Sequence, residues 1–386
     1  MTALDVEPAG GRLSVRDFVS GGSALTAEHL ALRQAVRDFL ADRLPTEDLV
    51  TRTESGAAFD RALWADLAGQ LGAHGITVAE EHGGSGFGWV EQALVFHELG
   101  RVLYAGPYLA AVGLAIPLLA ACDDQEARER WLPGLAAGEL IATVALDTPM
   151  RDPLRVRREG GAARLTGRLS HVMFAAQADV LFVPVTGEDG AVSLFAVPAG
   201  AGVSARPLAS LDMTREFATV DLEDAAAVPV GAPGEGDTVL DLVRDRAVLA
   251  LSAEQVGGTE AVLEMAVDYA KVREQFDRPI GSFQAIKHTC SRMMLELESA
   301  RALTEHAAWI ADERPSMLPA AVAACGALCS EAYAQAAYDA LHIHGGLGFT
   351  WEHRAHLYYR RAKSDELLFG SPGTHRARLA RWICDS

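Results

Sequence analysis

The segment YAKVREQFDRPIGSFQAIKH, which runs from Tyr269 to His288, lies between two long helical patterns. The first pattern ends at Val272 and the second begins at Phe283, so the Pro-Ile-Gly run at 279–281 predicts the corner of a helix pair. Arg273 and Phe276 lie at this corner. A guanidinium there can extend beyond the helices and bind a phosphate through paired hydrogen bonds. The phenyl ring beside it offers an apolar face to a heteroaromatic ring.

The sequence HIHGGLGF, from His342 to Phe349, ends another helical pattern, which covers residues 320–343. Gly345 and Gly346 have no Cβ atoms, so their backbone N–H groups can approach an anion closely. Further helical patterns cover residues 238–272, 283–312, 353–369 and 374–383. The long patterns predict an antiparallel helical bundle that extends from residue 238 to residue 386.

The chain before residue 238 changes character twice. Residues 1–24 are rich in glycine, which predicts a flexible tail, and residues 25–140 show the apolar spacing of helices. Residues 141–237 contain short runs rich in β-branched residues, and the runs at 179–185 and 191–197 flank a turn that predicts a hairpin. The predicted fold class is therefore α+β, with an antiparallel β domain between two helical regions.

The charge balance limits the partners that this chain can have. Its 386 residues include 34 Lys and Arg against 52 Asp and Glu, a formal net charge of −18. An acidic surface repels phosphate backbones, which argues against a nucleic-acid partner. The uncharged stretch 103–122 is long enough to cross a bilayer, but it contains prolines and glycines and precedes Asp123 and Asp124. We therefore expect a buried helix hairpin and no membrane partner.

Cysteine and histidine spacing argues against disulfides and metals. The five cysteines lie far apart without a CxxC pair, and no targeting segment is recognisable, which predicts a reduced, cytoplasmic protein. The densest group of histidines is His342, His344, His353 and His356. Cysteine or carboxylate partners at metal-ligand spacing are missing beside them in the sequence, so we expect no metal site.

The segments 269–288 and 342–349 together resemble the acyl-CoA dehydrogenase family. The pattern YxxxRxQFxxPIGxFQAxxH begins at Tyr269, and HGGxGF begins at His344. The resemblance covers nearly the whole chain, including Gly83–Gly88, Glu98–Arg101, Trp131–Glu139 and Leu211–Arg215. It implies a helical N-terminal domain at 25–140, an antiparallel β-barrel at 141–237 and a C-terminal four-helix bundle at 238–386.

The resemblance also implies an FAD-dependent enzyme that introduces a double bond between the α- and β-carbons of an acyl-CoA substrate. In the family, the adenosine-pyrophosphate end of FAD is held by the neighbouring subunit. By resemblance, Arg273, Phe276, His342, Gly345 and Gly346 have this role. His342 stands where many members have glutamine, and it can still donate a hydrogen bond. The electron acceptor that the resemblance implies is an electron-transfer flavoprotein.

This chain departs from the family at the catalytic base, which is a glutamate on one of two elements. The two corresponding positions here are Phe369 and Ala247, and neither side chain can accept a proton. Asp245 is close in sequence but points about 200° away from Ala247 on a helix. Asp365 and Glu366 fit a solvated helix face better than a base. The catalytic residue is therefore unassigned.

The middle domain departs from the family as well. The segment LDTPMRD, from Leu146 to Asp152, replaces a Thr-Glu-Pro…Gly-Ser-Asp loop that contacts flavin and thioester. His171-Val172-Met173 replaces a Trp-x-Thr strand segment that contacts the flavin ring. We therefore do not expect these polar flavin contacts in the chain's own cleft.

Three hypotheses accommodate these departures. The chain resembles the subunit without the catalytic Glu in heteromeric α2β2 acyl-CoA dehydrogenases of actinobacterial steroid side-chain degradation. A homologous partner subunit would then supply the Glu, and this chain would complete the partner's FAD site. Alternatively, the chain forms a self-sufficient homotetramer with Asp245 or Glu366 as an atypical base. The third hypothesis is a non-catalytic scaffold that binds no flavin.

Overall fold

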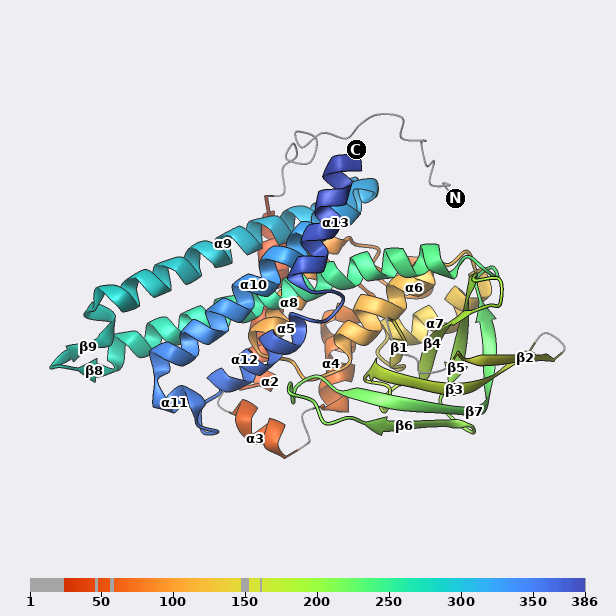
Figure 1. Cartoon of the computed structure of the whole chain (residues 1–386), viewed down its shortest axis with the longest axis horizontal. Helices are drawn as coiled ribbons and strands as arrows, with labels where there is room; N and C mark the ends of the chain where they lie inside the picture. Colours follow the sequence, from red (N-terminus) through yellow and green to blue (C-terminus); the bar gives the residue numbers. More distant parts are fainter. Residues whose placement is uncertain (1–23, 46–47, 56–58, 147–152, 160–161, 386) are drawn as a thin grey trace.

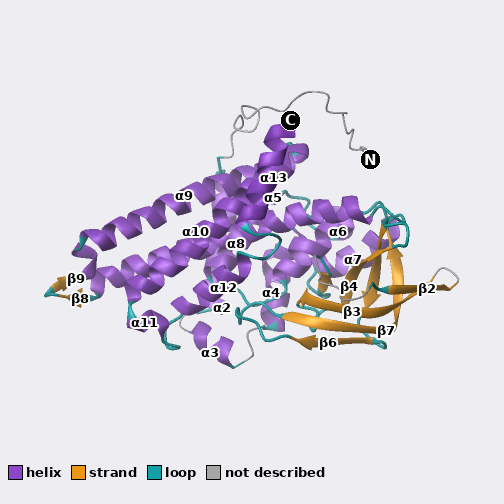
Figure 2. Cartoon of the chain, viewed as in Figure 1, coloured by secondary structure: helices purple, strands orange, loops and turns teal. Residues whose placement is uncertain are grey.

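The computed structural model describes residues 24–45, 48–55, 59–146, 153–159 and 162–385. Helices form both the N-terminal and the C-terminal regions, and strands form the middle one. Figure 2 shows the strands of the middle region gathered at one end of an elongated molecule, with long helices and one short pair of strands at the other end. The predicted α+β class, with a β domain between two helical regions, is confirmed. Apart from Ala24, the predicted tail lies outside the described residues.

Polar caps begin several helices of the N-terminal region. Thr26 accepts a hydrogen bond from the N–H of His29 at the start of the first one, and Asp60 and Asp124 cap two others in the same way. The helices of this region are α2 (Ala27–Arg43), α3 (Leu49–Glu54), α4 (Arg61–Leu71), α5 (Trp89–Arg101), α6 (Ile116–Ala121) and α7 (Gln125–Ala136), with short 3₁₀ turns η2 (Ala73–Gly75) and η3 (Glu80–His82).

The uncharged stretch 103–122 is buried, as predicted, but it does not form a hairpin. A π-helical segment, η4 (Leu109–Ala115), continues directly into α6 as one buried helix. Pro117 lies where the π-helical segment passes into α6, and because it has no backbone N–H it interrupts the regular hydrogen bonding of the helix at that point. A side chain at Gly113 would contact Leu109 and Ala250, so this glycine serves close packing and does not break the helix.

The β domain is one bent sheet with the order β1-β4-β5-β7-β3-β2, and β6 also pairs with β7. The predicted hairpin is confirmed, because β4 and β5 pair antiparallel through the turn at 187–190. One pairing differs from the antiparallel prediction, because β1 runs parallel to β4. Thr143 Oγ1 on β1 donates to the Met173 carbonyl on β3 at 2.6 Å, so distant strands approach each other across the bent sheet. The strands are β1 (Ala142–Val144), β2 (Arg155–Glu159), β3 (Ala162–Met173), β4 (Val180–Thr186), β5 (Val192–Pro198), β6 (Val203–Pro207) and β7 (Phe217–Val230).

The C-terminal bundle is built around a central apolar helix, α10 (Leu318–His344), which contacts α8, α9, α12 and α13. Together with the preceding turn η6 (Pro315–Met317), α10 is the one helix among the described residues that is long and apolar enough to span a membrane, and 72% of its apolar window is buried in the protein. It is therefore a core helix of the bundle. The other bundle helices are α8 (Gly236–Val272), α9 (Gln284–Glu313), α12 (Ala355–Asp365) and α13 (Pro372–Asp385).

The two helical regions share one core, because α8 packs against α5 as well as against the bundle. A Cβ atom at Gly257 would collide with the His97 carbonyl, and one at Gly100 would collide with the Glu254 carbonyl. The absence of side chains at Gly100 and Gly257 therefore lets the two backbones approach directly. This contact fixes the N-terminal helices against the bundle.

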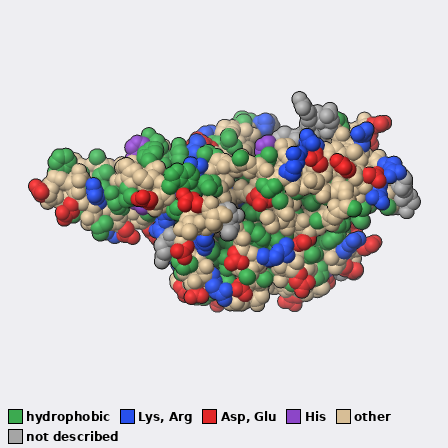
Figure 3. Space-filling model, turned by 90° about the horizontal axis from the view of Figure 1, so that it is seen from below, with side chains coloured by type: hydrophobic (Ala, Val, Ile, Leu, Met, Phe, Trp, Pro, Cys, Tyr) green, Lys and Arg blue, Asp and Glu red, His purple; other side chains and the backbone are tan. Residues whose placement is uncertain are grey.

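Buried charges reinforce the same junction. Glu98 on α5 accepts a hydrogen bond from Arg37 on α2, and Glu260 on α8 pairs with Arg301 on α9 at 2.9 Å. Burial alone would raise the pKa of Glu98, but hydrogen bonds from His97 and Arg37 outweigh it and lower the pKa to about 2. Four helices are thus joined by ion pairs inside the protein. On the surface, Lys and Arg side chains lie among Asp and Glu side chains across the face shown in Figure 3.

Candidate cofactor-binding site

A short hairpin forms the far end of the bundle, opposite the sheet (Figure 1). It consists of β8 (Glu274–Gln275) and β9 (Arg278–Pro279), and Phe276 and Asp277 make the turn with φ angles of 55° and 59°. Two successive positive φ angles are typical of a type I′ turn, which usually takes Asn or Gly. Phe276 is 86% exposed in this strained position. An exposed ring held at a backbone cost indicates a functional contact.

Arg273 caps the C-terminal end of α8 beside this hairpin. Its backbone N–H donates to the Tyr269 carbonyl at 2.9 Å, and its carbonyl accepts from Ile280 at 2.8 Å. The backbone of Arg273 is therefore fixed, whereas its side chain is exposed and has no ion pair with any residue that the structure describes. Arg278 differs, because its guanidinium lies over the Phe283 ring at 4.2 Å. Arg273 is thus the guanidinium of the hairpin that is available to an anion.

The Gly345-Gly346 pair forms the second half of the site. Gly345 ends α10 with φ 60° and ψ −137°, a conformation that only glycine adopts readily, and Gly346 begins α11 (Gly346–Phe349). A Cβ atom at either position would meet nothing within 4 Å. The backbone of the pair is therefore open to a ligand.

A ring contact brings the two halves to the same end of the bundle. Tyr269, one helical turn before Arg273, stacks on His344, which directly precedes Gly345, with ring centroids 4.4 Å apart. Segments separated by about 70 residues in the chain therefore meet here. Figure 1 shows α11 and the β8–β9 hairpin at the same end of the molecule.

His342 lies one turn before the glycine pair and is exposed. Its ring contacts the Tyr338 ring in a tilted arrangement with centroids 4.2 Å apart, and its Nδ1 lies 3.2 Å from the Tyr338 carbonyl. Because a carbonyl can only accept, Nδ1 carries the proton, and the neutral ring offers Nε2 as an acceptor. The hydrogen-bond donation predicted for His342 toward a ligand therefore requires a doubly protonated ring.

Neither of the two positions that correspond to the usual base holds a carboxylate. Ala247 is fully buried in α8, and Phe369 follows α12 with a φ angle of 59°. Asp245 pairs with Arg378 at 2.6 Å, and Glu366 pairs with Lys363. Burial raises the pKa of Asp245, and Arg378 opposes this. Both alternative bases are therefore engaged by cations.

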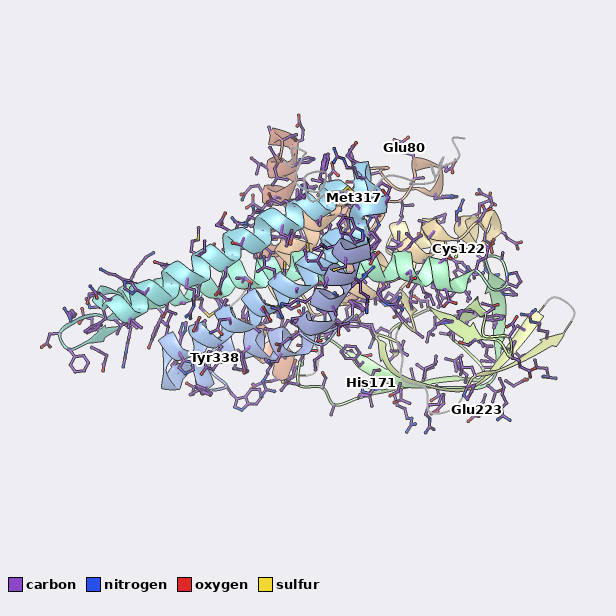
Figure 4. The ribbon with its side chains drawn as sticks, turned by 45° about the horizontal axis from the view of Figure 1, so that its top comes forward. Glu80, Cys122, His171, Glu223, Met317 and Tyr338 are labelled. Carbon is purple, nitrogen blue, oxygen red and sulfur yellow. The ribbon has the colours of Figure 1, made fainter. Side chains whose placement is uncertain are left out.

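The strand segment expected to contact a flavin ring ends β3. His171 has a φ angle of 59°, and its Nδ1 lies 2.8 Å from Ser170 Oγ (Figure 4). Met173 is buried and its carbonyl accepts from Thr143. Leu146 is partly buried, and residues 147–152 of the substituted loop lie outside the described residues. The side chains of His171 and Met173 do not reproduce the Trp-x-Thr pattern.

A buried ion cluster, which sequence reasoning missed, lies beside Met173 where helices meet sheet. Arg215 approaches Met173 Sδ at 4.0 Å and pairs with Glu254 at 2.7 Å and with Asp365 at 3.2 Å. Arg361 pairs with Asp212 at 2.7 Å. These five residues, Asp212, Arg215, Glu254, Arg361 and Asp365, are named the junction cluster.

The prediction that Asp365 belongs to a solvated helix face is wrong, because Asp365 is 1% exposed. The last turn of α12 points its carboxylate at Arg215, which the sequence places 150 residues away. Burial raises the pKa of Asp365 to about 7, although Arg215 and Arg361 oppose the shift. The junction cluster has three carboxylates against two guanidiniums, so a proton on Asp365 balances its charge.

The described residues fit one end of FAD and not the other. A free guanidinium, an exposed ring and an open glycine backbone suit a pyrophosphate with its adenine, and they lie together at one end of the bundle. Met173 has no hydroxyl to donate to a flavin ring, and the His171 imidazole lies beside the Ser170 hydroxyl. Groups of three or more metal-binding side chains are also absent from the part of the chain that the structure describes.

Comparisons with known proteins identify the family to which both helical domains are similar. The N-terminal domain of acyl-CoA dehydrogenases matches residues 26–139, and the C-terminal domain matches residues 242–384. The acyl-CoA dehydrogenase IpdE2 of Mycobacterium tuberculosis is 31% identical over 360 residues, which is 93% of this chain and 98% of IpdE2.

Two solved structures are similar over nearly the whole chain. The ChsE4–ChsE5 complex of Mycobacterium tuberculosis has 31% identity and a TM-score of 0.86, and the match covers 95% of this chain and all of the other. The Tcur3481–Tcur3483 steroid acyl-CoA dehydrogenase has 26% identity and a TM-score of 0.82, with 93% and 98% covered. With both terminal domains matched and the fold shared from end to end, the chain belongs to the FAD-dependent acyl-CoA dehydrogenase family.

Proposed function

We propose that the chain is the subunit of a heteromeric acyl-CoA dehydrogenase that completes the FAD site of a homologous partner carrying the catalytic Glu. One observation carries the proposal. The groups that would act on a neighbour's cofactor are present and exposed at the end of the bundle, whereas the groups that would act in the chain's own cleft are replaced at Ala247, Phe369 and Met173. Loss of one set without the other is expected of a subunit that works in trans.

The residues of this chain would bind the cofactor and leave proton transfer to the partner. Arg273 would pair with the pyrophosphate, the backbone of Gly345 and Gly346 would approach the same phosphates, and Phe276 would cover the adenine ring. Bound FAD supplies the acceptor for the hydride from the β-carbon. A carboxylate of the partner would take the α-proton, because the described positions for such a group here hold alanine and phenylalanine.

The substrate that we propose is the CoA thioester of a bulky acyl group, such as a steroid side chain. The similar Tcur3481–Tcur3483 steroid acyl-CoA dehydrogenase supports this choice of substrate. The ChsE4–ChsE5 complex, with its two differently named subunits, supports the heteromeric assembly. Electrons would leave through an electron-transfer flavoprotein. We further propose a cytoplasmic location and domain limits of 25–140, 141–237 and 238–386.

The two competing functions predict different products on expression. A self-sufficient homotetramer needs Asp245 or Glu366 as its base, and each of these carboxylates is held by a cation in the structure. A scaffold needs no exposed arginine and no strained aromatic at the bundle end. The proposed function accounts for both features.

The test is a flavin count on purified protein. The chain is expressed alone and with the homologous subunit that co-purifies with it, and FAD per chain is measured by absorbance after gel filtration. We expect little flavin alone and one FAD for every two chains in the complex. A yellow, active homo-oligomer would support the self-sufficient enzyme, and a complex without flavin would support the scaffold.

A further inference from the structure

Three aromatic rings, those of Tyr269, His344 and His353, contact one another in sequence at the candidate site. The rings of Tyr269 and His344 are 4.4 Å apart and inclined by 25°, and the rings of His344 and His353 are 4.4 Å apart and inclined by 41°. Tyr269 belongs to α8, His344 to α10, and His353 to the segment before α12. Three segments of the bundle end are therefore joined by ring contacts.

Each end of the Tyr269–His344 contact is attached directly to one ligand-binding group. The carbonyl of Tyr269 accepts the backbone N–H of Arg273 at 2.9 Å, so the tyrosine lies one turn below the guanidinium on the same helix. His344 is bonded covalently to Gly345, whose positive φ begins the open backbone. A change in the distance between the two rings would therefore change the distance between the guanidinium and the glycine pair.

The histidine orientations are fixed by backbone groups. His344 Nδ1 donates to the Ala340 carbonyl at 2.7 Å, and His353 Nδ1 accepts from the Ala355 N–H at 3.3 Å. Burial lowers the pKa of His344, and it lowers the pKa of His353 to about 4. Both rings are thus neutral near pH 7. They supply a fixed surface and no charge of their own to the site.

We propose that Tyr269 and His344 are positioning residues, which set the spacing between Arg273 and the Gly345-Gly346 backbone so that one pyrophosphate can contact both. This inference rests on the proposed function. In this role, Tyr269 and His344 act on FAD binding through Arg273 and the glycine pair, without contacting FAD themselves. A ligand that bridges two segments binds more tightly when the segments are held at the bridging distance before it arrives.

The test measures FAD affinity of the flavin-bearing assembly in which the full chain purifies. Bound FAD is removed, and the apoprotein is titrated with FAD while flavin fluorescence is followed. Tyr269→Leu removes the stacked ring and is expected to weaken FAD binding about tenfold. Tyr269→Phe keeps the ring and is expected to restore the affinity. Gel filtration and the thermal midpoint are expected to stay unchanged in both variants.

A double variant separates positioning from general stability. If the ring pair acts through Arg273, then Tyr269→Leu combined with Arg273→Gln binds FAD no more weakly than Arg273→Gln alone. Independent, additive losses would overturn the inference. The control is Trp309→Leu, which breaks the His306–Trp309 stack near the other end of α9 and is expected to leave FAD affinity unchanged.

The outcomes distinguish the inference from the function on which it rests. If Arg273→Gln weakens FAD binding and Tyr269→Leu does not, the positioning role is wrong and the proposed function stands. If Arg273→Gln has no effect, or if no assembly of the chain takes up FAD, the proposed function fails and the inference fails with it.

Discussion

The outer end of the helical bundle and the junction between helices and sheet differ in how far their residues match the family pattern. At the outer end, the residues that resemble the family's cofactor-binding residues are exposed, and Phe276 and Gly345 have positive φ angles. At the junction, the family's polar residues are replaced, and buried ion pairs lie beside them. This contrast is what the proposed function predicts for a subunit whose exposed end serves a partner.

The largest effect is expected where the junction cluster is broken. Arg361→Met removes the salt bridge to Asp212 and the hydrogen bond to the Thr214 carbonyl, so the buried Asp212 carboxylate loses its cationic partner. Such a loss costs about 3–5 kcal/mol of unfolding free energy. Urea denaturation followed by circular dichroism measures it. Arg43→Met, which breaks a surface pair with Asp66, is the control and is expected to change stability by less than about 1 kcal/mol.

That prediction tests whether the junction has become a purely structural region. A small loss of stability in Arg361→Met would mean that the junction cluster is not a stabilising element. The junction could then no longer be contrasted with the outer end as a region that serves stability.

The next effect concerns the outer end. Arg273→Gln is expected to weaken FAD binding roughly 100-fold, because two charge-assisted hydrogen bonds to phosphate are lost. Fluorescence titration of the apo assembly measures this change. Arg278→Gln, on the same hairpin, is the matched control, since that guanidinium already lies over Phe283. Equal losses in the two variants would show a general charge effect and would contradict a specific pyrophosphate contact.

A smaller effect on the free energy of unfolding is expected from Asp365, because burial raises the pKa of its carboxyl to about 7. Between about pH 4 and pH 7 the folded chain retains a proton that the unfolded chain has released. The unfolding free energy of the wild type should therefore fall as pH rises through this window. Asp365→Asn cannot ionise, so its stability should fall less between pH 5 and pH 8.

Urea unfolding at several pH values compares the two proteins. Asp123→Asn, at a fully exposed carboxylate, is expected to keep the pH slope of the wild type. If Asp365→Asn keeps that slope as well, the proton belongs to another member of the junction cluster, and Glu254→Gln would identify it.

The smallest effect is expected at the tip of the hairpin, where one substitution should change the free energy of unfolding and the affinity for FAD in opposite directions. Phe276→Asn places a residue that tolerates positive φ in the turn, so the free energy of unfolding should rise by about 0.5–1 kcal/mol. Loss of the ring should weaken FAD binding several-fold. Asp277→Asn changes the neighbouring turn residue without removing a ring, and it should leave FAD binding unchanged. Unaltered FAD affinity in Phe276→Asn would show that the exposed ring has no role in binding.

Local pattern was sufficient to predict the long helices. The patterns at 238–272 and 283–312 correspond to α8 and α9 within two residues at each end. The β4–β5 hairpin was also predicted, because β-branched runs flank a turn of recognisable composition. The residue pattern did not reveal β2, β6 or most of β3, although the resemblance placed His171–Met173, the end of β3, in a strand. Arginines on the exposed face of β3 conceal the alternation of buried residues such as Leu165 and Leu169.

The candidate site divides in the same way. Arg273 and the glycine pair each lie within a continuous motif, so the sequence was sufficient to propose them as site residues, and their role in FAD binding stays a prediction. The junction cluster could not, because Arg215 and Asp365 are 150 residues apart and nothing local marks either of them as buried. The Tyr269–His344 contact was missed for the same reason, since it joins two helices that the sequence shows separately.

The close approach of α5 and α8 has a consequence for how the molecule folds and tolerates change. Because those two backbones touch, the helices before and after the sheet form one cooperative unit, and residues 142–230 are topologically an insertion within it. Substitutions can then accumulate in the inserted strands without disrupting the packed helices that position Arg273. Residues of the cleft can therefore be substituted while the outer end of the bundle keeps the structure that would contact a partner subunit.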